Sequence, residues 1–187
     1  EGVTLRATHV AINGDYAYVS YNVEGSTYLG GIDVINIADP TAPVIELQAI
    51  LPNTDIGSIS YYNNSLFIAG ATNSNDVDES NPAVVIKMEL QGGLPTENIS
   101  LIDVSSYVAT DVIANSNGIY SVSGDNGDLS KYDLNSNNII KSFNPINTSN
   151  NEVGERKNYN SNIYGELKLW ITLFIFIFFL FWKFFSC

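Results

Sequence analysis

Apolar and polar residues alternate in short runs along the first 143 residues, and turn-forming residues separate the runs. The stretch 30–47 shows the pattern: it alternates through Ile37, breaks at Asp39 and Pro40, and resumes the alternation at Val44. Successive side chains of a β-strand point to opposite faces, so a period of two indicates strands with one buried face. Asp and Pro at the break favour a turn. The sequence therefore predicts a series of hairpins.

These alternating runs recur about every 50 residues, and each recurrence contains four of them. The second run of each unit follows a turn that is rich in Asn and Gly, residues that tolerate positive φ. Hairpin-linked groups of four strands are typical of the blades of a β-propeller. The expected strands are 10–12, 16–19, 32–37 and 44–50, then 59–61, 66–69, 84–90 and 99–104, then 112–114, 119–122, 129–134 and 139–143.

We therefore predict an all-β protein that is a partial β-propeller, an open array of about three four-stranded blades. The propeller domain is expected at 1–143, with blades at about 5–52, 53–105 and 106–143. A β-sandwich with evenly spaced strands is the alternative. Closed propellers typically contain about four to eight blades, so three units do not close a ring. The chain is thus expected to be a piece of a propeller or a truncated product.

The last part of the chain has a different composition. Residues 144–166 are polar and rich in Asn, as in a linker, and 167–187 form a hydrophobic segment that predicts a C-terminal helix. As a helix, Leu167 to Phe185 would extend about 28 Å, just enough for a transmembrane helix in a hydrocarbon core of roughly 30 Å. A membrane anchor is one interpretation. A frameshift in an AT-rich gene, which also yields Phe, Ile and Leu, is the other.

Charge and residue counts exclude several classes of function. The chain has 8 Lys and Arg against 20 Asp and Glu, a net charge of −12, which argues against a nucleic-acid partner. One His and one Cys cannot form a zinc tetrad. His9 is expected to be structural, because no Gly-x-Ser-x-Gly nucleophile motif accompanies it.

Two acidic loops are the candidate metal sites. Asp76 and Asp78 lie in the stretch NSNDVDES of the second blade, and Asp125 and Asp128 lie in GDNGD of the third. Oxygen ligands at alternate positions suit Ca²⁺, although neither loop has the full EF-hand pattern. Calcium is the one cofactor that the sequence suggests, and solvated acidic loops are the alternative.

Residues 31–43, GIDVINIADPTAP, carry a family resemblance. They resemble the LVIVD repeat of bacterial surface β-propellers, in which a glycine precedes alternating aliphatic residues and an Asp-Pro turn. Asn36 stands where the family usually has Asp, and the later blades lack the Asp-Pro turn. The resemblance extends over about 5–143. It implies a propeller in a cell-surface or secreted protein, and it implies little about activity because propellers host many functions.

The resulting hypothesis is a non-catalytic propeller segment with a role in binding or display, whose partner is a protein or a glycan. Membrane attachment would involve Leu167 to Phe185. Five tyrosines either form a binding face or pack between blades: Tyr21, Tyr28, Tyr61, Tyr62 and Tyr107. One alternative is a metal-assisted hydrolase or lactonase, which requires acidic side chains from different blades to meet at one end. The other is a truncated, frameshifted product without a function of its own.

Overall fold

The computed structural model describes residues 4–23, 28–73, 81–104, 106–123 and 128–143. The chain divides into two compact units, Glu1–Ile146 and Asn147–Cys187, and the described residues belong to the first. The predicted linker 144–166 and the predicted helix 167–187 lie outside them. Within the described segments, no helix is long and apolar enough to cross a membrane.

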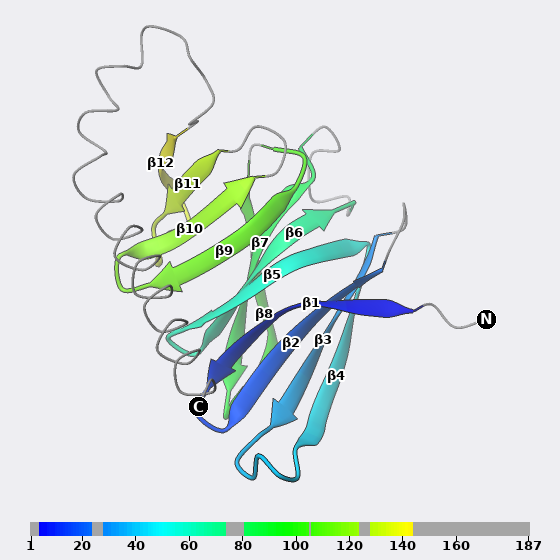
Figure 1. Ribbon diagram of the computed structural model, residues 1–187. Helices are drawn as coiled ribbons and strands as arrows, with labels where there is room; N and C mark the ends of the chain where they lie inside the picture. The colour runs from blue at the N-terminus through cyan, green and yellow to red at the C-terminus, as the bar shows by residue number, and fades with distance from the viewer. Residues whose placement is uncertain (1–3, 24–27, 74–80, 105, 124–127, 144–187) are drawn as a thin grey trace, which may run out of the picture. The chain divides into compact units, whose positions relative to one another are not determined.

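Twelve strands in the described residues form three antiparallel sheets of four strands each, paired in chain order (Figure 1). Each predicted strand overlaps one of them, so the prediction of three four-stranded β units is confirmed for the described residues. The first sheet contains β1 (Leu5–Asn13), β2 (Tyr16–Val23), β3 (Leu29–Asn36) and β4 (Val44–Pro52). The second contains β5 (Thr54–Tyr62), β6 (Ser65–Thr72), β7 (Ala83–Gln91) and β8 (Leu94–Asp103). The third contains β9 (Ala109–Asn115), β10 (Gly118–Ser123), β11 (Leu129–Tyr132) and β12 (Ile139–Phe143).

Tight turns with positive φ join several of these strands. Asn63 and Asn64, between β5 and β6, have φ values of 47° and 57°. Gly92 and Gly93, between β7 and β8, have φ values of 61° and 87°. Two-residue turns of this kind match the twist of antiparallel strands, and Asn and Gly are the residues that adopt them at low cost. The local sequence therefore fixes where these hairpins reverse.

The three sheets repeat one another in detail, including a bulge near the start of each first strand. The register skips one residue there: Thr8 in β1, Gly57 in β5 and Thr110 in β9. Each skip lies opposite the same part of the second strand, when β2, β6 and β10 are aligned on their first residues. Bulges increase local twist and are built-in features of a fold. This alignment defines which residues of the three sheets occupy equivalent positions.

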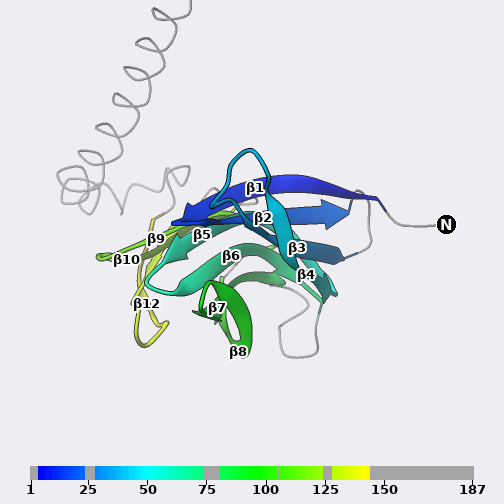
Figure 2. The ribbon, with the colours of Figure 1, turned by 90° about the horizontal axis from the view of Figure 1, so that it is seen from below.

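The sheets pack on one another mainly through their first strands. β5 contacts β1 on one side and β9 on the other, whereas β4, β8 and β12 make no extensive contact with another described sheet. In the view of Figure 2, β5 and β9 lie close together, and β4, β8 and β12 lie on different sides. The sheets therefore diverge from a shared line of first strands.

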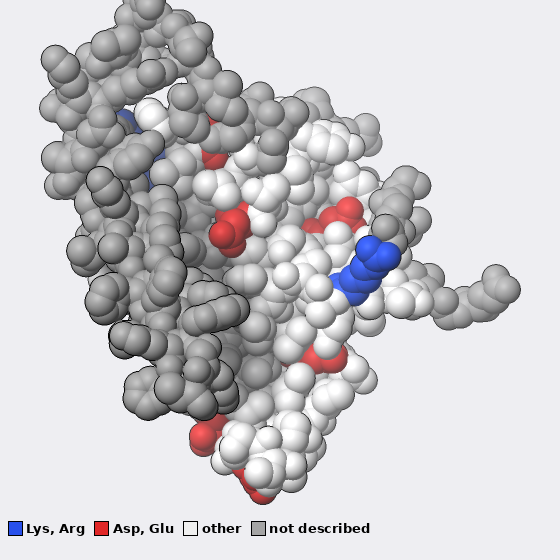
Figure 3. Space-filling view, viewed as in Figure 1, with Lys and Arg blue, Asp and Glu red and all other residues white. Residues whose placement is uncertain are grey.

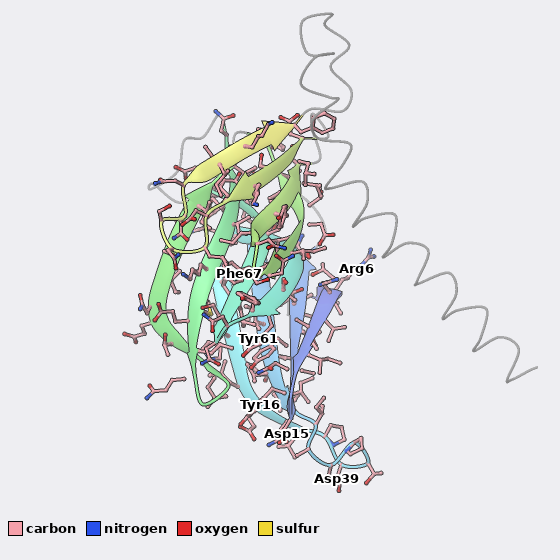
Figure 4. All side chains as sticks on the ribbon, turned by 90° about the vertical axis from the view of Figure 1, so that its left-hand side faces the viewer. Arg6, Asp15, Tyr16, Asp39, Tyr61 and Phe67 are labelled. Atoms are coloured by element: carbon pink, nitrogen blue, oxygen red, sulfur yellow. The ribbon has the colours of Figure 1, made fainter. Side chains whose placement is uncertain are left out.

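Two hydrophobic cores result, one on each face of the second sheet. The side chains of β6 alternate between them, because Leu66 and Ile68 belong to the core with the first sheet and Phe67 and Ala69 to the core with the third. All residues of β6 are buried. Figure 4 labels Phe67 within the array. The second sheet is thus covered on both faces, and each outer sheet is covered by another sheet on one face.

Candidate functional site

The predicted calcium ligands fall mostly outside the described residues. Asp76, Asp78 and Asp125 lie there, and only Asp128 can be placed. Among the described residues, no three His, Cys, Asp or Glu side chains gather closely enough to hold a metal ion. Burial raises the pKa of Asp128 above its ordinary value. The calcium prediction and the hydrolase alternative both depend on the loops that contain the other three aspartates.

His9 connects two sheets. Its Nδ1 atom lies 2.8 Å from the carbonyl oxygen of Ile59 on β5. The equivalent position of β5 holds Ser58, whose hydroxyl donates a hydrogen bond to the carboxylate of Asp111 on β9. Asp111 in turn occupies the equivalent position of the third sheet. Although these are the residue types of a catalytic triad, their hydrogen bonds link neighbouring sheets in series and do not form one relay.

The five candidate tyrosines separate into three groups. Tyr61 packs against the first core and stacks on Tyr18, with ring centroids 6.2 Å apart and planes at 1°. Tyr62 packs against the second core. Tyr21 lies on the outer face of the first sheet, where its side chain is close to Asp33. Figure 4 shows Tyr61 near Tyr16, between the first two sheets. The remaining two, Tyr28 and Tyr107, come together.

Tyr28 and Tyr107 meet at the end of the array where the first strands begin. Tyr28 immediately precedes β3, and Tyr107 lies two residues before β9, so they come from the first and third sheets. The Tyr107 side chain lies close enough to that of Tyr28 to influence its ionisation. Asp55, near the start of β5 in the second sheet, accepts a hydrogen bond from the backbone N–H of Leu29 at 3.2 Å. One residue from each sheet therefore contributes to this cluster, which we call the tyrosine end.

The surroundings of Tyr28 favour the neutral form of its hydroxyl group. Burial raises the pKa of Tyr28, and the neighbouring Tyr107 and the negative charge of Asp55 raise it further. Burial also raises the pKa of Asp55, and the N–H of Leu29 opposes this effect. Tyr107 is 59% exposed. The cluster thus offers an accessible aromatic ring, hydroxyl groups and a carboxylate within one rigid frame.

Buried polar atoms without hydrogen-bond partners among the described residues accumulate at the same end. Asn22 Oδ1 lies at the end of β2, Ser106 Oγ lies before β9, and Asp128 Oδ1 lies before β11. Since buried polar groups are almost always hydrogen-bonded, such atoms indicate places where ordered water or a ligand completes the bonding. Two further atoms of this kind, in Tyr132 and Asn137, lie elsewhere.

One face of the array carries few charges. In Figure 3, uncharged atoms predominate on the visible face of the described residues, and the acidic side chains are scattered.

Sequence reasoning identified Tyr28 and Tyr107 as candidates but not Asp55. Nothing in the local sequence distinguishes Asp55, because its role depends on tyrosines from two other sheets.

Comparisons with known proteins give structural similarity but no family. No family model matches the chain, and no curated protein matches it. Among solved structures, the chain is similar to one described as "Crystal structure of Nidogen/Laminin Complex", with a TM-score of 0.48 and 12% sequence identity. The match covers 70% of this chain and 43% of that one. This similarity is too low to support a function, and the LVIVD resemblance stays a prediction.

Proposed function

We propose that residues 5–143 are an open segment of a β-propeller. Three features support this assignment: each sheet has four antiparallel strands in chain order, the first strands pack together, and the fourth strands diverge. Propeller blades surround a common axis in this way. The repeated bulge near the start of each first strand is a further sign that the sheets are copies of one unit.

The proposed function of this segment is non-catalytic binding of a protein or glycan ligand at the tyrosine end. The observation that carries it is the meeting of Tyr28, Asp55 and Tyr107 from three different sheets. Tyrosine supplies a large contact area and a hydroxyl group at low cost in conformational entropy. Binding groups at the end of a rigid scaffold are a common arrangement in proteins.

The ligand chemistry follows from the groups present. The Tyr107 ring offers a flat apolar surface to a sugar ring or a side chain, and the tyrosine hydroxyl groups and Asp55 offer hydrogen bonds to hydroxyl or amide groups. We further propose, from the sequence alone, a cell-surface or secreted location and membrane attachment through Leu167 to Phe185.

Two probes test this function: the labelled full-length chain is applied to a glycan array and to a library of displayed peptides. For any ligand that binds, we expect Tyr107→Ala to reduce affinity about tenfold or more, as for an aromatic residue at the centre of an interface. Ile139→Ala is the matched control, because Ile139 is similarly exposed (55%) but begins β12 at the opposite end of the array. Absence of binding to both probes, or equal losses in the two variants, would contradict the proposal.

A further inference from the structure

Two faces of the array have no sheet packed on them in the described residues. We call the face that a sheet turns toward the preceding sheet its back face, and the opposite one its front face. The back face of β1–β4 includes Val10, Ile12, Val19, Asp33, Ile45 and Ile50. The front face of β9–β12 includes Ile113, Tyr120, Val122, Leu129 and Lys131.

The back face of the first sheet is the same surface that the other sheets use for packing. Val10, Ile59 and Val112 occupy equivalent positions on the three first strands. Ile59 and Val112 are 0% and 2% exposed because each packs on the preceding sheet, whereas Val10 is 51% exposed. Ile12, Ile45 and Ile50 on the same face are at least as exposed, at 64%, 53% and 60%. This face therefore has the composition of an interface between sheets.

The front face of the third sheet is its counterpart. Tyr120 is equivalent to Tyr18 and Phe67, both of which are buried against the following sheet. Lys131 is equivalent to Lys87, whose Nζ donates a hydrogen bond across the interface to the carbonyl oxygen of Leu134 at 3.3 Å. The third sheet thus presents the surface that receives the next sheet elsewhere in the array.

We propose that two copies of this chain associate head to tail, so that the back face of β1–β4 in each packs on the front face of β9–β12 in the other. Each of the two contacts joins different surfaces, and in a ring of two copies a two-fold axis relates them, so that the interface as a whole is isologous. Three sheets from each copy give six, within the range of about four to eight blades that close a propeller. The inference rests on the equivalence of the sheets and does not depend on the ligand of the tyrosine end.

The charged groups on the two faces are compatible with burial against each other. Asp33 is the only charged residue that the register, bulge residues aside, places on the back face of β1–β4. Its carboxylate accepts a hydrogen bond from Gln48 Nε2 at 3.0 Å, and the side chain of Tyr21 lies close to it. Because Gln48 donates to it, covering the face leaves the carboxylate with a hydrogen-bond partner. The opposing face carries the cations of Lys131 and Lys141 and the carboxylate of Asp111, to which the hydroxyl of Ser58 donates a hydrogen bond.

The equivalence also identifies which residues meet across the new interface. Within the chain, the backbone N–H of Ala114 donates to Ser60 Oγ at 3.2 Å. Ser60 is equivalent to Ile113, and Ala114 is equivalent to Ile12. Ile113 of one copy is therefore expected beside Ile12 of the other. Likewise, Lys131 is expected to reach the carbonyl oxygen of Ile37, the equivalent of Leu134.

Disulfide cross-linking of the full-length chain in detergent tests this arrangement. The only native cysteine is first removed by Cys187→Ser. In that background, the pair Ile12→Cys and Ile113→Cys is expected to form a covalent dimer on oxidation. The control pair, Ile12→Cys and Ile45→Cys, has both cysteines on the back face, where head-to-tail packing never brings them together. The three replaced residues, Ile12, Ile45 and Ile113, are all exposed isoleucines (64%, 53% and 56%), so the two pairs should affect folding similarly.

Light scattering of the unmodified chain gives an independent measurement. We expect a protein mass that rises with concentration to twice the 20.4 kDa of one chain and no further. Lys131→Glu should weaken the dimer, because it removes the donor to Ile37 and adds a charge of the same sign as Asp33. A monomer at all concentrations, equal cross-linking of the two cysteine pairs, or a ladder of larger oligomers would overturn the closed dimer. The first of these outcomes would leave further sheets of a longer polypeptide as the occupant of the open faces.

Discussion

The second sheet and the first sheet have the same topology and the same bulge but very different environments. All eight residues of β6 are buried, whereas β2 at the equivalent place is only partly buried. The first strands differ more strongly, since Ile59 is 0% exposed and its equivalent Val10 is 51% exposed. The side chains at these two positions are similar in size and hydrophobicity. Burial in this fold is therefore decided by the neighbouring sheet and not by the strand itself.

The same comparison explains why the first sheet exposes apolar side chains on its back face. A repeat unit that packs on its neighbours needs apolar side chains on both faces, and a terminal unit without a neighbour leaves one of them exposed. Large exposed apolar patches on soluble proteins usually mark interaction surfaces. The back face of β1–β4 thus carries apolar side chains like those of the second sheet, but no sheet in the described residues packs on it.

Truncation at the equivalent positions should give the largest difference between the two sheets. We expect Ile59→Ala to lower the free energy of unfolding by about 4 kcal/mol, because it removes buried methyl groups from the first core. Val10→Ala should cost less than about 1 kcal/mol at concentrations where the chain is monomeric. Denaturant unfolding followed by circular dichroism measures both values. Similar losses for the two variants would mean that Val10 is already covered within one chain.

Gly70 of β6 is another position at which the first and second sheets differ, because the backbone of β5 approaches it closely. A Cβ atom there would lie 1.8 Å from the backbone oxygen of Asp55, because β5 bulges toward β6 at this place. We expect Gly70→Ala to destabilise the protein by about 3 kcal/mol, since backbone must move to relieve the overlap. The equivalent residue of the first sheet is Tyr21, and Tyr21→Ala should cost about 1 kcal/mol. Thermal unfolding of both variants decides whether the second sheet is the more tightly constrained.

Tyr18 and Tyr132 are buried tyrosines that differ in their hydroxyl groups. Tyr18 Oη donates to the carbonyl oxygen of Gly93 at 3.0 Å, whereas Tyr132 Oη has no hydrogen-bond partner among the described residues. Tyr18→Phe should therefore cost about 1 kcal/mol and Tyr132→Phe should be close to neutral. Equal costs would show that the hydroxyl of Tyr18 does not contribute to the contact between the first and second sheets.

Tyr18 also gives a pH dependence. Burial, followed by the neighbouring Tyr61, raises its pKa from 10.0 to about 12. The folded state therefore resists ionisation more than the unfolded state does, so stability falls as the pH rises from 10 to about 12. The Tyr18→Phe variant should lose this part of the decline, which unfolding curves at increasing pH can measure. Below pH 10, the two proteins should differ only by the lost hydrogen bond.

The smallest effect is expected at Asp55. Because burial raises its pKa above the ordinary 3.8, the folded state favours the protonated carboxyl. The stability that this group contributes is full below pH 3.8 and is lost as the pH rises through the folded-state pKa. Asp55→Asn should thus stabilise the protein slightly at neutral pH, and the gain should shrink on acidification. A loss of stability at neutral pH would show that the carboxylate is required by its partners.

The strands and several turns were predictable because their signals are local. Alternation marks the strands, and Asn63, Asn64, Gly92 and Gly93 mark two reversals of the chain. Which faces are covered was not predictable, because Val10 and Ile59 look alike in the sequence. Only the packing of one sheet on another distinguishes them.

The candidate site was less accessible to sequence reasoning. Tyr28 and Tyr107 were candidates as aromatic residues near turns, but their proximity joins residues far apart in the sequence, and Asp55 gave no local signal. The acidic loops attracted attention through their spacing, yet Asp128 is the one member that the structure places. Clusters assembled from three sheets depend on long-range packing, which periodicity does not encode.

Hydroxyl-radical footprinting with mass spectrometry tests most directly whether the back face of the first sheet is open while the second sheet is enclosed. In the monomer at low concentration, we expect Val10 and Ile12 to be oxidised readily and Ile59 and Ile68 to be protected. At concentrations that favour association, protection should extend to Val10 and Ile12 and leave Ile59 unchanged. Oxidation of Ile59 at the rate of Val10, or protection of Val10 in the monomer, would contradict the account.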